Sequence, residues 1–380
     1  MARIGIDATA ISPSGKGVSN YQKNIIQALS ELDSPHEYFV FLNKTHYVPS
    51  FYGKQNWHFI PVSIWNHFFW EQFQLPYFAR KFKLDLFHNT SDRFPILLDI
   101  PLILFLFEIP HYRYGLTVNG NGKSKIYNWI SEWLSISMFP RSLKQAKRVL
   151  VSSHHTKKDL VERFQVEPRK IQVNYPGRGN FFKPLVDERC FLEIRKRMGA
   201  PEGYVLHFAT GDLRENTETV IKSFNAAKGR LPKGLKLILA GGGAKIQNDS
   251  KDIIYLPFLT GDSLIQVYQG AKLYVDPSSY EGFGFQIVEA MACGVPVIAS
   301  SKTCIPEIVG DAGMLLDPKD ALGFSQGMIR ILTDQSLWNQ MRQRGLVRAG
   351  EFSWNKTARE TLSAYEEILN GKQAIVIQDE

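Results

Sequence analysis

The sequence predicts an α/β protein of two domains, each a doubly wound parallel sheet between helices. Short apolar runs alternate with amphipathic stretches along the chain, which is typical of strands that are connected by helices. A strand, a glycine-containing loop and a helix follow one another from Arg3 and again from Tyr204, so the same plan occurs twice. The length of 380 residues is more than one ordinary domain holds and is enough for two.

The composition is that of a folded protein in a reducing compartment. Apolar residues make up 44% of the chain and charged residues 22%, which is typical of globular proteins and not of disordered ones. The three cysteines, Cys190, Cys293 and Cys304, are an odd number in a long chain and argue against a disulfide framework. No C-x-x-C pair, histidine cluster or Asp-x-Asp triplet indicates a metal site, so we expect neither a metal nor a cofactor.

The start of the chain is too short and polar to be a signal peptide, and the longest apolar run, Leu102–Phe107, has the length of a strand. We therefore expect a cytoplasmic protein that is either soluble or peripheral at the inner face of the cell membrane.

The two halves differ in charge. Residues 1–180 hold 22 Lys and Arg against 13 Asp and Glu, a net charge of +9, whereas residues 181–380 hold 23 against 24, a net charge of −1. The first half also carries 29 of the 47 aromatic residues. A basic, aromatic half suits an anionic membrane surface or an acidic acceptor. No recognisable motif supports nucleic acid as the partner.

The first half begins with a strand over Arg3–Asp7, a loop rich in Ser and Gly over Ala8–Gly17, and a helix near Val18–Leu32. The glycine spacing is not G-x-G-x-x-G, so a dinucleotide is only weakly indicated. Further strands are expected over Tyr38–Leu42, Leu84–His88, Leu102–Phe107, Val149–Ser152 and Ile171–Val173. Helices are expected over Ile126–Phe139 and Ser153–Phe164, and a glycine-rich loop over Gly115–Lys125.

Aromatic residues are dense between Trp57 and Phe87, where Trp65, Phe69 and Phe73 recur at a spacing of four. Two interpretations are open. A basic run follows, Arg80, Lys81 and Lys83, as in helices that lie in a membrane interface. Helical aromatic stripes more often face a core, and we favour a core helix for this reason.

The run Tyr175–Gly179 is rich in Pro and Gly and marks the domain boundary. The second half then repeats the plan of the first. Strands are expected over Tyr204–Phe208, Leu235–Ala240 and Ile253–Leu256, and helices over Thr217–Lys228, Asp262–Gly270, Leu322–Leu332, Gln335–Glu351 and Lys356–Leu369. The triplet Gly241–Gly243 is not followed by Lys-Ser/Thr, so a tight turn is expected there and not a P-loop.

The most informative stretch is Asp276–Ala299, DPSSYEGFGFQIVEAMACGVPVIA. It predicts the end of a strand, a turn at Gly282-Phe283-Gly284, a helix from Phe285 to Cys293 and another strand. Glu281 lies just before this helix and Glu289 lies two turns into it. A helix N-terminus beside glycines suits a phosphate, and two carboxylates suit sugar hydroxyls, which together indicate a sugar-phosphate pocket. The alternative is that both acids are ordinary solvated charges.

This stretch resembles the signature of glycosyltransferase family 4: a Glu, Gly-Phe-Gly, a second Glu after seven residues, then Ala-Met-Ala-Cys-Gly-Val-Pro-Val. Members are retaining enzymes of the GT-B fold, in which two Rossmann-like domains face an inter-domain cleft. The resemblance implies an acceptor-side domain over residues 1–180, a nucleotide-sugar domain over 181–352 and a helix over 353–380 that crosses back to the first domain.

The resemblance also implies roles for single residues. Glu281 would face the donor sugar and Glu289 the ribose, while the backbone of Gly282, Phe283, Gly284 and Phe285 would meet the sugar or the diphosphate. Gly17 matches the first glycine loop of the family, which closes over the donor, although it could equally be a turn residue that needs a positive φ. The base would lie near Pro257 and Phe258.

Two positions depart from the family. Many members have His-Asp where this chain has Phe107-Glu108, and a phenyl ring cannot make the hydrogen bond of a histidine. Glu108 keeps the acid, and His111 is a candidate substitute for the missing histidine. His88, at the end of a strand, either faces the acceptor side or is a buried, hydrogen-bonded histidine.

The second departure lies in Arg214-Glu215-Asn216, where relatives commonly have Arg-Lys-Asn. A glutamate repels a diphosphate. Either Glu215 turns away and Arg214 binds the anion alone, or donor binding is altered. We expect Arg214 to bind the diphosphate, because a guanidinium suits bidentate phosphate contact.

The function that follows is the retaining transfer of a hexose or deoxyhexose from a nucleotide diphosphate sugar. The acceptor would be a glycan or a lipid-linked sugar in cell-surface polysaccharide synthesis. Glu281, Glu289 and Arg214 are the expected catalytic residues, with the leaving diphosphate stabilised electrostatically. The alternatives are another GT-B enzyme, such as a phosphorylase or a sugar-nucleotide epimerase, and a non-catalytic protein that binds sugar or serves as a scaffold.

Overall fold

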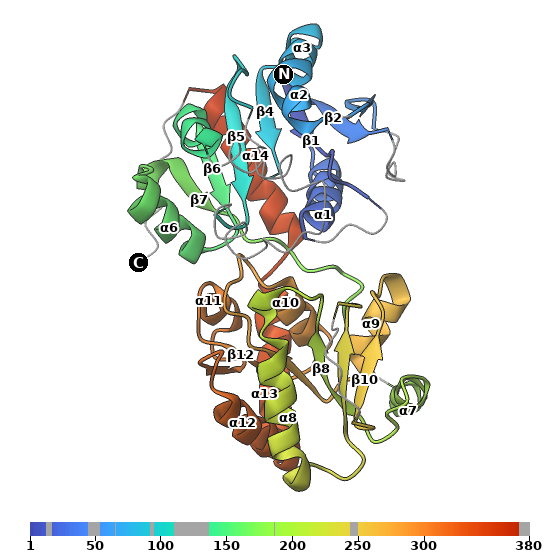
Figure 1. Cartoon of the computed structure of the whole chain (residues 1–380). Coiled ribbons are helices and arrows are strands. Elements are labelled where there is room, and N and C mark those ends of the chain that lie inside the picture. The colour runs from blue at the N-terminus through green and yellow to red at the C-terminus, as the bar shows by residue number, and fades with distance from the viewer. Residues whose placement is uncertain are drawn as a thin grey trace. The chain divides into compact units, whose positions relative to one another are not determined.

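The computed structural model describes residues 1–12, 17–44, 54–64, 66–91, 95–109, 137–185, 187–243 and 250–371. The chain divides into two compact units (Figure 1). Unit 1 comprises Met1–Gly177 together with Trp354–Glu380, and unit 2 comprises Arg178–Ser353. The last helix of the chain thus belongs to the same unit as the first strand.

Unit 1 is built on a parallel sheet with the strand order β3-β2-β1-β4-β5-β6-β7 in the part of the chain that is described. The strands are β1 (Arg3–Asp7), β2 (Glu37–Asn43), β3 (Trp57–Val62), β4 (Leu86–Asn89), β5 (Leu102–Leu106), β6 (Arg148–Val151) and β7 (Ile171–Val173). The order runs outward from β1 in one direction and from β4 in the other, which is the doubly wound arrangement predicted from the sequence.

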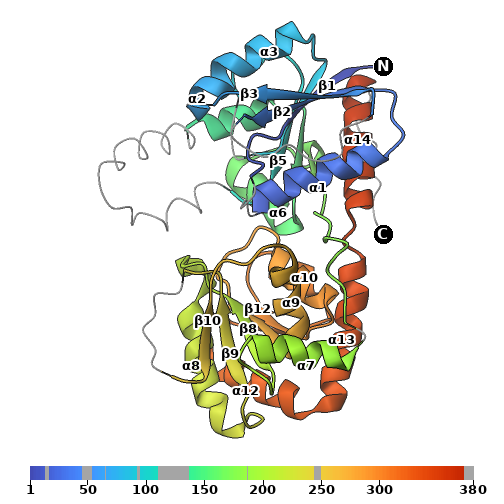
Figure 2. The ribbon, with the colours of Figure 1, turned by 90° about the vertical axis from the view of Figure 1, so that its right-hand side faces the viewer.

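The helices of unit 1 are α1 (Gly17–Glu31), α2 (His67–Phe69), the π-helical turn η1 (Trp70–Gln74), α3 (Leu75–Lys81), α6 (His154–Phe164) and α14 (Trp354–Leu369). The expected helix Ile126–Phe139 and loop Gly115–Lys125 lie largely or wholly outside the described residues. Helix α14 packs beside α1 (Figures 1 and 2). It is tied to β7 and the residues after it, since the Thr357 hydroxyl donates to the Tyr175 carbonyl at 2.6 Å.

The aromatic stretch of unit 1 faces the opposite way from the interpretation that we favoured. Trp70, Leu75 and Ala79 pack into the core, whereas Phe69 and Phe73 are exposed, so the predicted core stripe was wrong. The reason is the π-helical turn η1, which takes one more residue per turn than an α-helix and shifts the buried positions to a spacing of five and then four. Trp65 lies outside the described residues.

Unit 2 has a second parallel sheet of the order β10-β9-β8-β11-β12-β13. Its strands are β8 (Tyr204–Phe208), β9 (Lys236–Ala240), β10 (Ile253–Leu256), β11 (Leu273–Asp276), β12 (Val297–Ser300) and β13 (Met314–Leu316). Its main helices are α7 (Glu188–Arg197), α8 (Thr217–Ala227), α9 (Gly261–Gly270), α10 (Phe285–Ala292), α11 (Ile305–Val309), α12 (Ala321–Thr333) and α13 (Gln335–Gly350). Strand order again reverses, here between β8 and β11.

The inner strands of both sheets are mostly apolar and buried, as expected where helices cover both faces of a parallel sheet, whereas the edge strands β3, β7, β10 and β13 are partly exposed. In unit 2, α8 lies against α12 and α10 against α13 (Figures 1 and 2). None of the described helices is both long and apolar enough to cross a membrane.

Candidate functional site

The candidate site of unit 2 lies where the strand order reverses, at the carboxyl ends of β8 and β11. Ligands of open α/β sheets bind at such a reversal, because the loops that follow the two strands leave in opposite directions. Here these loops are joined to one another. The backbone N–H of Ser279 donates to the Arg214 carbonyl at 2.8 Å, and the Asn216 side chain donates to the Pro277 carbonyl at 2.8 Å. The loop after β8, here called the Arg214 loop (residues 209–216), is therefore held beside the loop after β11 (residues 277–284), which contains Gly282-Phe283-Gly284.

Glycines allow the neighbouring loops to approach backbone to backbone. A Cβ on Gly243 would lie 1.9 Å from the Thr210 carbonyl carbon, and one on Gly242 would lie 3.3 Å from the Phe258 backbone nitrogen. The triplet Gly241–Gly243 is thus needed for close packing against the loops after β8 and β10. This contact also brings Pro257 and Phe258 to the same edge of the sheet, where Phe258 is exposed.

Within the described part of the chain, the N-cap residue of α10 makes no side-chain capping hydrogen bond. This residue is Gly284, which has a φ of 85° and lies in the left-handed region that favours glycine. Phe283 is buried and its ring packs edge-on against Phe285 and Phe352. The turn is thereby anchored by an aromatic ring, while the end of the helix offers its partial positive charge to an anion.

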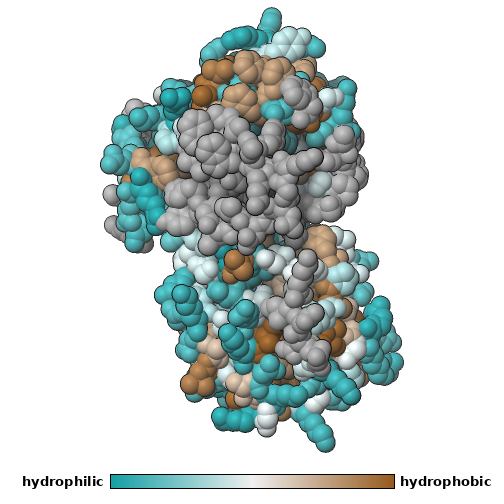
Figure 3. Space-filling model, in the orientation of Figure 1, coloured by the Kyte–Doolittle hydropathy of each residue, from teal (hydrophilic) through white to brown (hydrophobic). Residues whose placement is uncertain are grey.

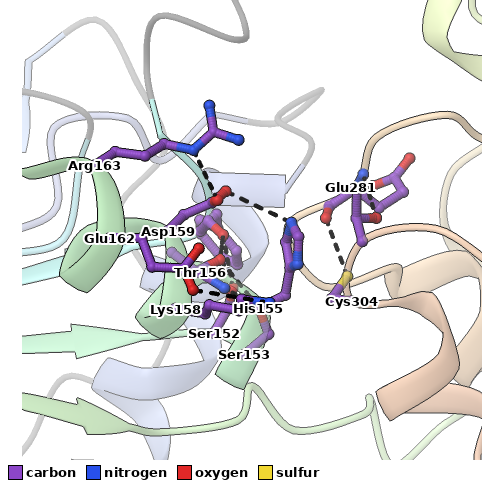
Figure 4. A network of polar contacts seen from close by, with 12 residues as sticks. Ser152, Ser153, His155, Thr156, Lys158, Asp159, Glu162, Arg163, Glu281 and Cys304 are labelled. Carbon is purple, nitrogen blue, oxygen red and sulfur yellow. Dashed lines mark hydrogen bonds and ion pairs between the residues drawn. The ribbon is translucent and has the colours of Figure 1, made fainter. Parts of the chain in front are cut away.

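Glu281 is half-buried and is positioned through its backbone. Its N–H donates to the Thr303 hydroxyl at 3.2 Å, and its carbonyl accepts from the Cys304 thiol at 3.1 Å (Figure 4). Thr303 has a positive φ of 55°, which is unusual for a β-branched residue. A strained residue that holds a candidate ligand-binding acid is typical of functional sites.

Glu289 is held by a tyrosine from α9. The Tyr268 hydroxyl donates to Glu289 Oε2 at 2.7 Å, and burial raises the pKa of Glu289 to about 7 although this hydrogen bond lowers it. Tyr268 is packed 6.1 Å from the ring of Tyr274, whose hydroxyl donates to Asp276 at 3.0 Å. Two buried tyrosines thus connect the acid on α10 to the acid at the end of β11.

Arg214 is oriented by a neighbouring carboxylate. Its Nη2 lies 2.8 Å from Asp212 Oδ2, its Nε lies 3.0 Å from the same oxygen, and its backbone N–H donates to Oδ1 at 2.9 Å. This two-point contact holds the planar guanidinium in one orientation. It also partly offsets the charge that Arg214 would present to an anion.

Glu215 is turned back onto its own loop. One carboxylate oxygen accepts from the Thr210 backbone N–H at 2.7 Å, and the other accepts from the Thr210 hydroxyl at 2.5 Å. Burial raises the pKa of Glu215, against these two hydrogen bonds, and the charges of Asp212 and Asp276 raise it further. The carboxylate therefore closes the loop that begins at the end of β8.

The corresponding edge of unit 1 is a network of buried polar groups at the ends of β1 and β4. Asp7 accepts from the hydroxyls of Thr9 at 2.7 Å and Ser91 at 2.6 Å. Gln22 of α1 donates to Thr90 at 2.9 Å. Gly17 starts α1 with a φ of 21°, and a Cβ placed there would meet nothing within 4 Å.

His88 lies inside unit 1. Its side chain has no exposed surface, its Nδ1 lies 2.7 Å from the Tyr365 hydroxyl of α14, and burial lowers its pKa to about 3. This is the buried, hydrogen-bonded histidine of the two sequence interpretations, and a contact with an acceptor finds no support. His111 lies outside the described residues.

Phe107 packs as an aromatic residue. Its ring lies edge-on to Tyr21 and Phe105, and its carbonyl accepts from the hydroxyls of Ser152 at 2.8 Å and Thr156 at 2.9 Å. Glu108, the next residue, is partly exposed at the same edge of the sheet.

One polar cluster at this edge was not foreseen from the sequence. On α6, His155 Nε2 lies 3.5 Å from Asp159 Oδ2, and Arg163 donates to Asp159 Oδ1 at 3.0 Å (Figure 4). The spacing of four between these residues on a predicted helix was a usable signal. The Thr156 hydroxyl of the same helix donates to the Phe107 carbonyl. The partly exposed His155 therefore lies on the helix that contacts Phe107, the residue that replaces the histidine of the family. Among the described residues, no group of three or more His, Cys, Asp or Glu side chains could hold a metal ion.

Both halves of the sequence match known families. Residues 15–178 match the family described as Glycosyltransferase Family 4, and residues 204–334 match the family described as Glycosyl transferases group 1. A similar sequence is the O-antigen chain mannosyltransferase B of Escherichia coli, which is 30% identical over 235 residues. The match covers 59% of this chain and 62% of that enzyme, so it spans less than two thirds of the relative's length.

Two solved structures share the fold over nearly the whole chain. The sucrose-phosphate synthase of Thermosynechococcus elongatus has a TM-score of 0.74 at 19% identity, covering 98% of this chain and 100% of that one. The HepE protein of Anabaena, solved in complex with UDP-glucose, has a TM-score of 0.70 at 17% identity, covering 96% and 100%. These likenesses show an α/β fold of the two-domain GT-B type.

Proposed function

The chain belongs, by both of its sequence domains, to the family 4-type glycosyltransferases, and we propose that it transfers a hexose or deoxyhexose from a nucleotide diphosphate sugar. The observation that carries the proposal is the hydrogen bond from Ser279 to the Arg214 carbonyl. It holds the loop that carries the oriented Arg214 guanidinium beside the loop that leads to the N-terminus of α10, at the strand reversal of unit 2. A guanidinium and a helix N-terminus are both groups that bind phosphate, and in this proposal both reach the pyrophosphate.

In this proposal different residues of unit 2 bind different parts of the donor. Arg214 and the amides at the start of α10 bind the diphosphate, and Glu281 binds the hydroxyls of the transferred sugar. Glu289 takes the ribose, and the base lies against Pro257 and Phe258. A carboxylate whose pKa is about 7 can either accept or donate a hydrogen bond, which suits a ribose diol.

The proposed chemistry is a same-face displacement that retains the anomeric configuration. The bond from the anomeric carbon to the diphosphate oxygen breaks, and a bond from that carbon to the acceptor oxygen forms on the same face. The acceptor proton passes to the departing diphosphate. Positive groups at the diphosphate stabilise its developing charge, which is electrostatic catalysis.

The acceptor is proposed to be a glycan or a lipid-linked sugar used in cell-surface polysaccharide synthesis, on the cytoplasmic side of a membrane. Support comes from the relative in Escherichia coli, whose name states that it is a mannosyltransferase of an O-antigen chain. The HepE complex with UDP-glucose supports a nucleotide sugar as the donor.

A thermal-shift screen with UDP-, GDP-, ADP- and dTDP-sugars tests the donor, because a ligand that binds the folded state raises the melting temperature. One nucleotide class should raise the melting temperature of the chain. Arg214→Ala should lower the affinity for that nucleotide sugar by roughly tenfold or more, and the rise in melting temperature should be smaller. Arg230→Ala on the exposed turn η4 (Lys228–Arg230) is the matched control and should change nothing. Failure of every nucleotide sugar to bind at millimolar concentration would remove the proposal.

A second candidate is a non-catalytic sugar-nucleotide binder, and Phe107 and Glu215 favour it because each replaces a polar or cationic group of the family. Release of nucleotide diphosphate from the donor that binds, with or without an acceptor extract, separates the two. Binding without any turnover supports the second candidate. Cleavage of an oligosaccharide by free phosphate would instead indicate a phosphorylase, and interconversion of the nucleotide sugar itself would indicate an epimerase.

A further inference from the structure

Unit 1 exposes a stripe of large aromatic side chains along one helical segment. Phe68, Phe69, Phe73 and Tyr77, here called the aromatic face, are 41%, 38%, 52% and 59% exposed. They lie on the continuous run of α2, η1 and α3, with the rings of Phe69 and Phe73 5.3 Å apart. Hydrophobic residues gather on the surface near α2 (Figure 3).

The exposure of this face is enforced by the helix itself. Trp70, Leu75 and Ala79 on its other side are buried in the core of unit 1, and Asn66 fixes the start of α2 by accepting from the Phe69 N–H at 3.0 Å. With those side chains held inside, the aromatic face has no way to turn inward. Four large exposed rings on one face are unusual for a surface that contacts only water.

Cations lie at the carboxyl-terminal end of the same segment. Lys81 and Lys83 are exposed, and the Lys81 ammonium lies 5.7 Å above the centre of the Phe82 ring. Arg80 is paired with Asp99 at 2.5 Å, so the two lysines carry the excess charge at this end. The only acid within the segment from His67 to Lys83 is Glu71, which is buried.

We propose that the aromatic face docks unit 1 on an anionic lipid bilayer. Aromatic rings favour the boundary between headgroups and acyl chains, and lysines that follow them reach the phosphates. The net charge of +9 in residues 1–180, against −1 in the remainder, gives the same end of the chain its attraction to an anionic leaflet. The inference goes beyond sugar transfer and does not depend on it.

Vesicle co-sedimentation of the whole chain tests the docking. The chain should sediment with vesicles that contain phosphatidylglycerol, far less with vesicles of phosphatidylcholine alone, and less at high salt because exposed charges are screened. Phe73→Ser with Tyr77→Ser should abolish sedimentation. Lys81→Gln with Lys83→Gln should lower the partition coefficient onto anionic vesicles by about fivefold per lysine. Phe181→Ser, at a ring of unit 2 that is 53% exposed, is the matched control and should sediment as the wild type does.

The effect of salt is measured on the unmodified chain, so this test of the proposal remains valid even if a variant folds poorly. Nucleotide-sugar binding measured in vesicle-free buffer should be the same in all these proteins, which separates loss of docking from loss of the donor site. The proposal is overturned if the wild type ignores anionic vesicles or if the serine variant still sediments. It is also overturned if the serine substitutions convert a dimer in vesicle-free buffer into a monomer, because the aromatic face would then bind a second copy of the chain.

Discussion

Glu215 stands where the resemblance to family 4 implies a lysine, and its surroundings explain how the acid is accommodated. Both carboxylate oxygens accept hydrogen bonds from Thr210, at 2.7 and 2.5 Å. The side chain therefore stabilises the loop after β8, but it leaves a negative charge beside the place proposed for a diphosphate. Arg214, on the same short turn, is already shared with Asp212. Charge at this point is therefore less positive than the family pattern implies.

Reversal of this one charge should strengthen donor binding. We expect Glu215→Lys to bind the nucleotide sugar on the order of tenfold more tightly, since a repulsion becomes an attraction at short range. Its melting temperature without ligand should fall because the Thr210 bonds are lost. The measurement is calorimetric titration with the nucleotide sugar found in the screen.

Glu218→Lys is the matched control, because it makes the same change of charge one turn along, at a side chain on α8 that is 74% exposed. Glu215→Gln should fall between the wild type and the lysine variant. If Glu215→Lys binds no more tightly than Glu218→Lys, the diphosphate does not lie beside the Arg214 loop.

Among the helices, α10 connects the sequence motif to the proposed chemistry. It is eight residues long, and its N-cap residue is Gly284, with a φ of 85°. A side chain at this position would strain the backbone, and its Cβ would lie 3.3 Å from Ile287. The turn and the direction of the helix N-terminus thus depend on a single Gly.

Gly284→Ala should lower the free energy of unfolding by about 1–2 kcal/mol, because alanine is strained in the left-handed region. It should also weaken nucleotide-sugar binding, since the amides at the start of α10 lose their direction. Chemical denaturation and calorimetry measure the two effects. Gly229→Ala, in η4 with nothing within 4 Å of the new methyl group, should affect neither. Unchanged donor affinity in Gly284→Ala would argue against an anion at the start of α10.

The helical segment from α2 to α3 shows where reasoning from periodicity failed. A spacing of four correctly indicated a helix, but the π-helical turn at Trp70–Gln74 placed Trp70, Leu75 and Ala79 in the core and left Phe69 and Phe73 exposed. Such a turn is decided by packing against the sheet and has no signature in the apolar spacing alone. For this reason Phe69 and Phe73, which were predicted to face the core, are exposed on the surface.

The stability of the whole chain should depend on pH through two groups whose pKa values are shifted in opposite directions. Burial raises the pKa of Glu289 from its ordinary 4.5 to about 7, and burial lowers the pKa of His88 from 6.5 to about 3. Glu289 therefore destabilises the fold as the pH rises from 4.5 through 7. His88 destabilises it as the pH falls from 6.5 towards 3, because only the unfolded chain takes up that proton readily.

Glu289→Gln isolates the first of these effects. The ligand-free variant should gain stability over the wild type as the pH rises from about 5 to about 8, by on the order of 2 kcal/mol. At the acid end the two proteins should unfold alike. Denaturant titrations at several pH values measure the difference, with Glu218→Gln on the exposed face of α8 as control. A difference that is constant across this range would mean that Glu289 ionises normally.

Taken alone, the sequence determined the alternation of strands and helices, the two parallel sheets and the stretch Asp276–Ala299, since these depend on local spacing and on residue types. Tertiary structure alone decided which strands are neighbours, and so placed the Arg214 loop against Ser279 at a strand reversal. It also decided that Glu215 bonds Thr210 and that His88 is buried against Tyr365 of α14. Side-chain direction and burial arise from contacts between residues far apart in the chain, and no local pattern records those contacts.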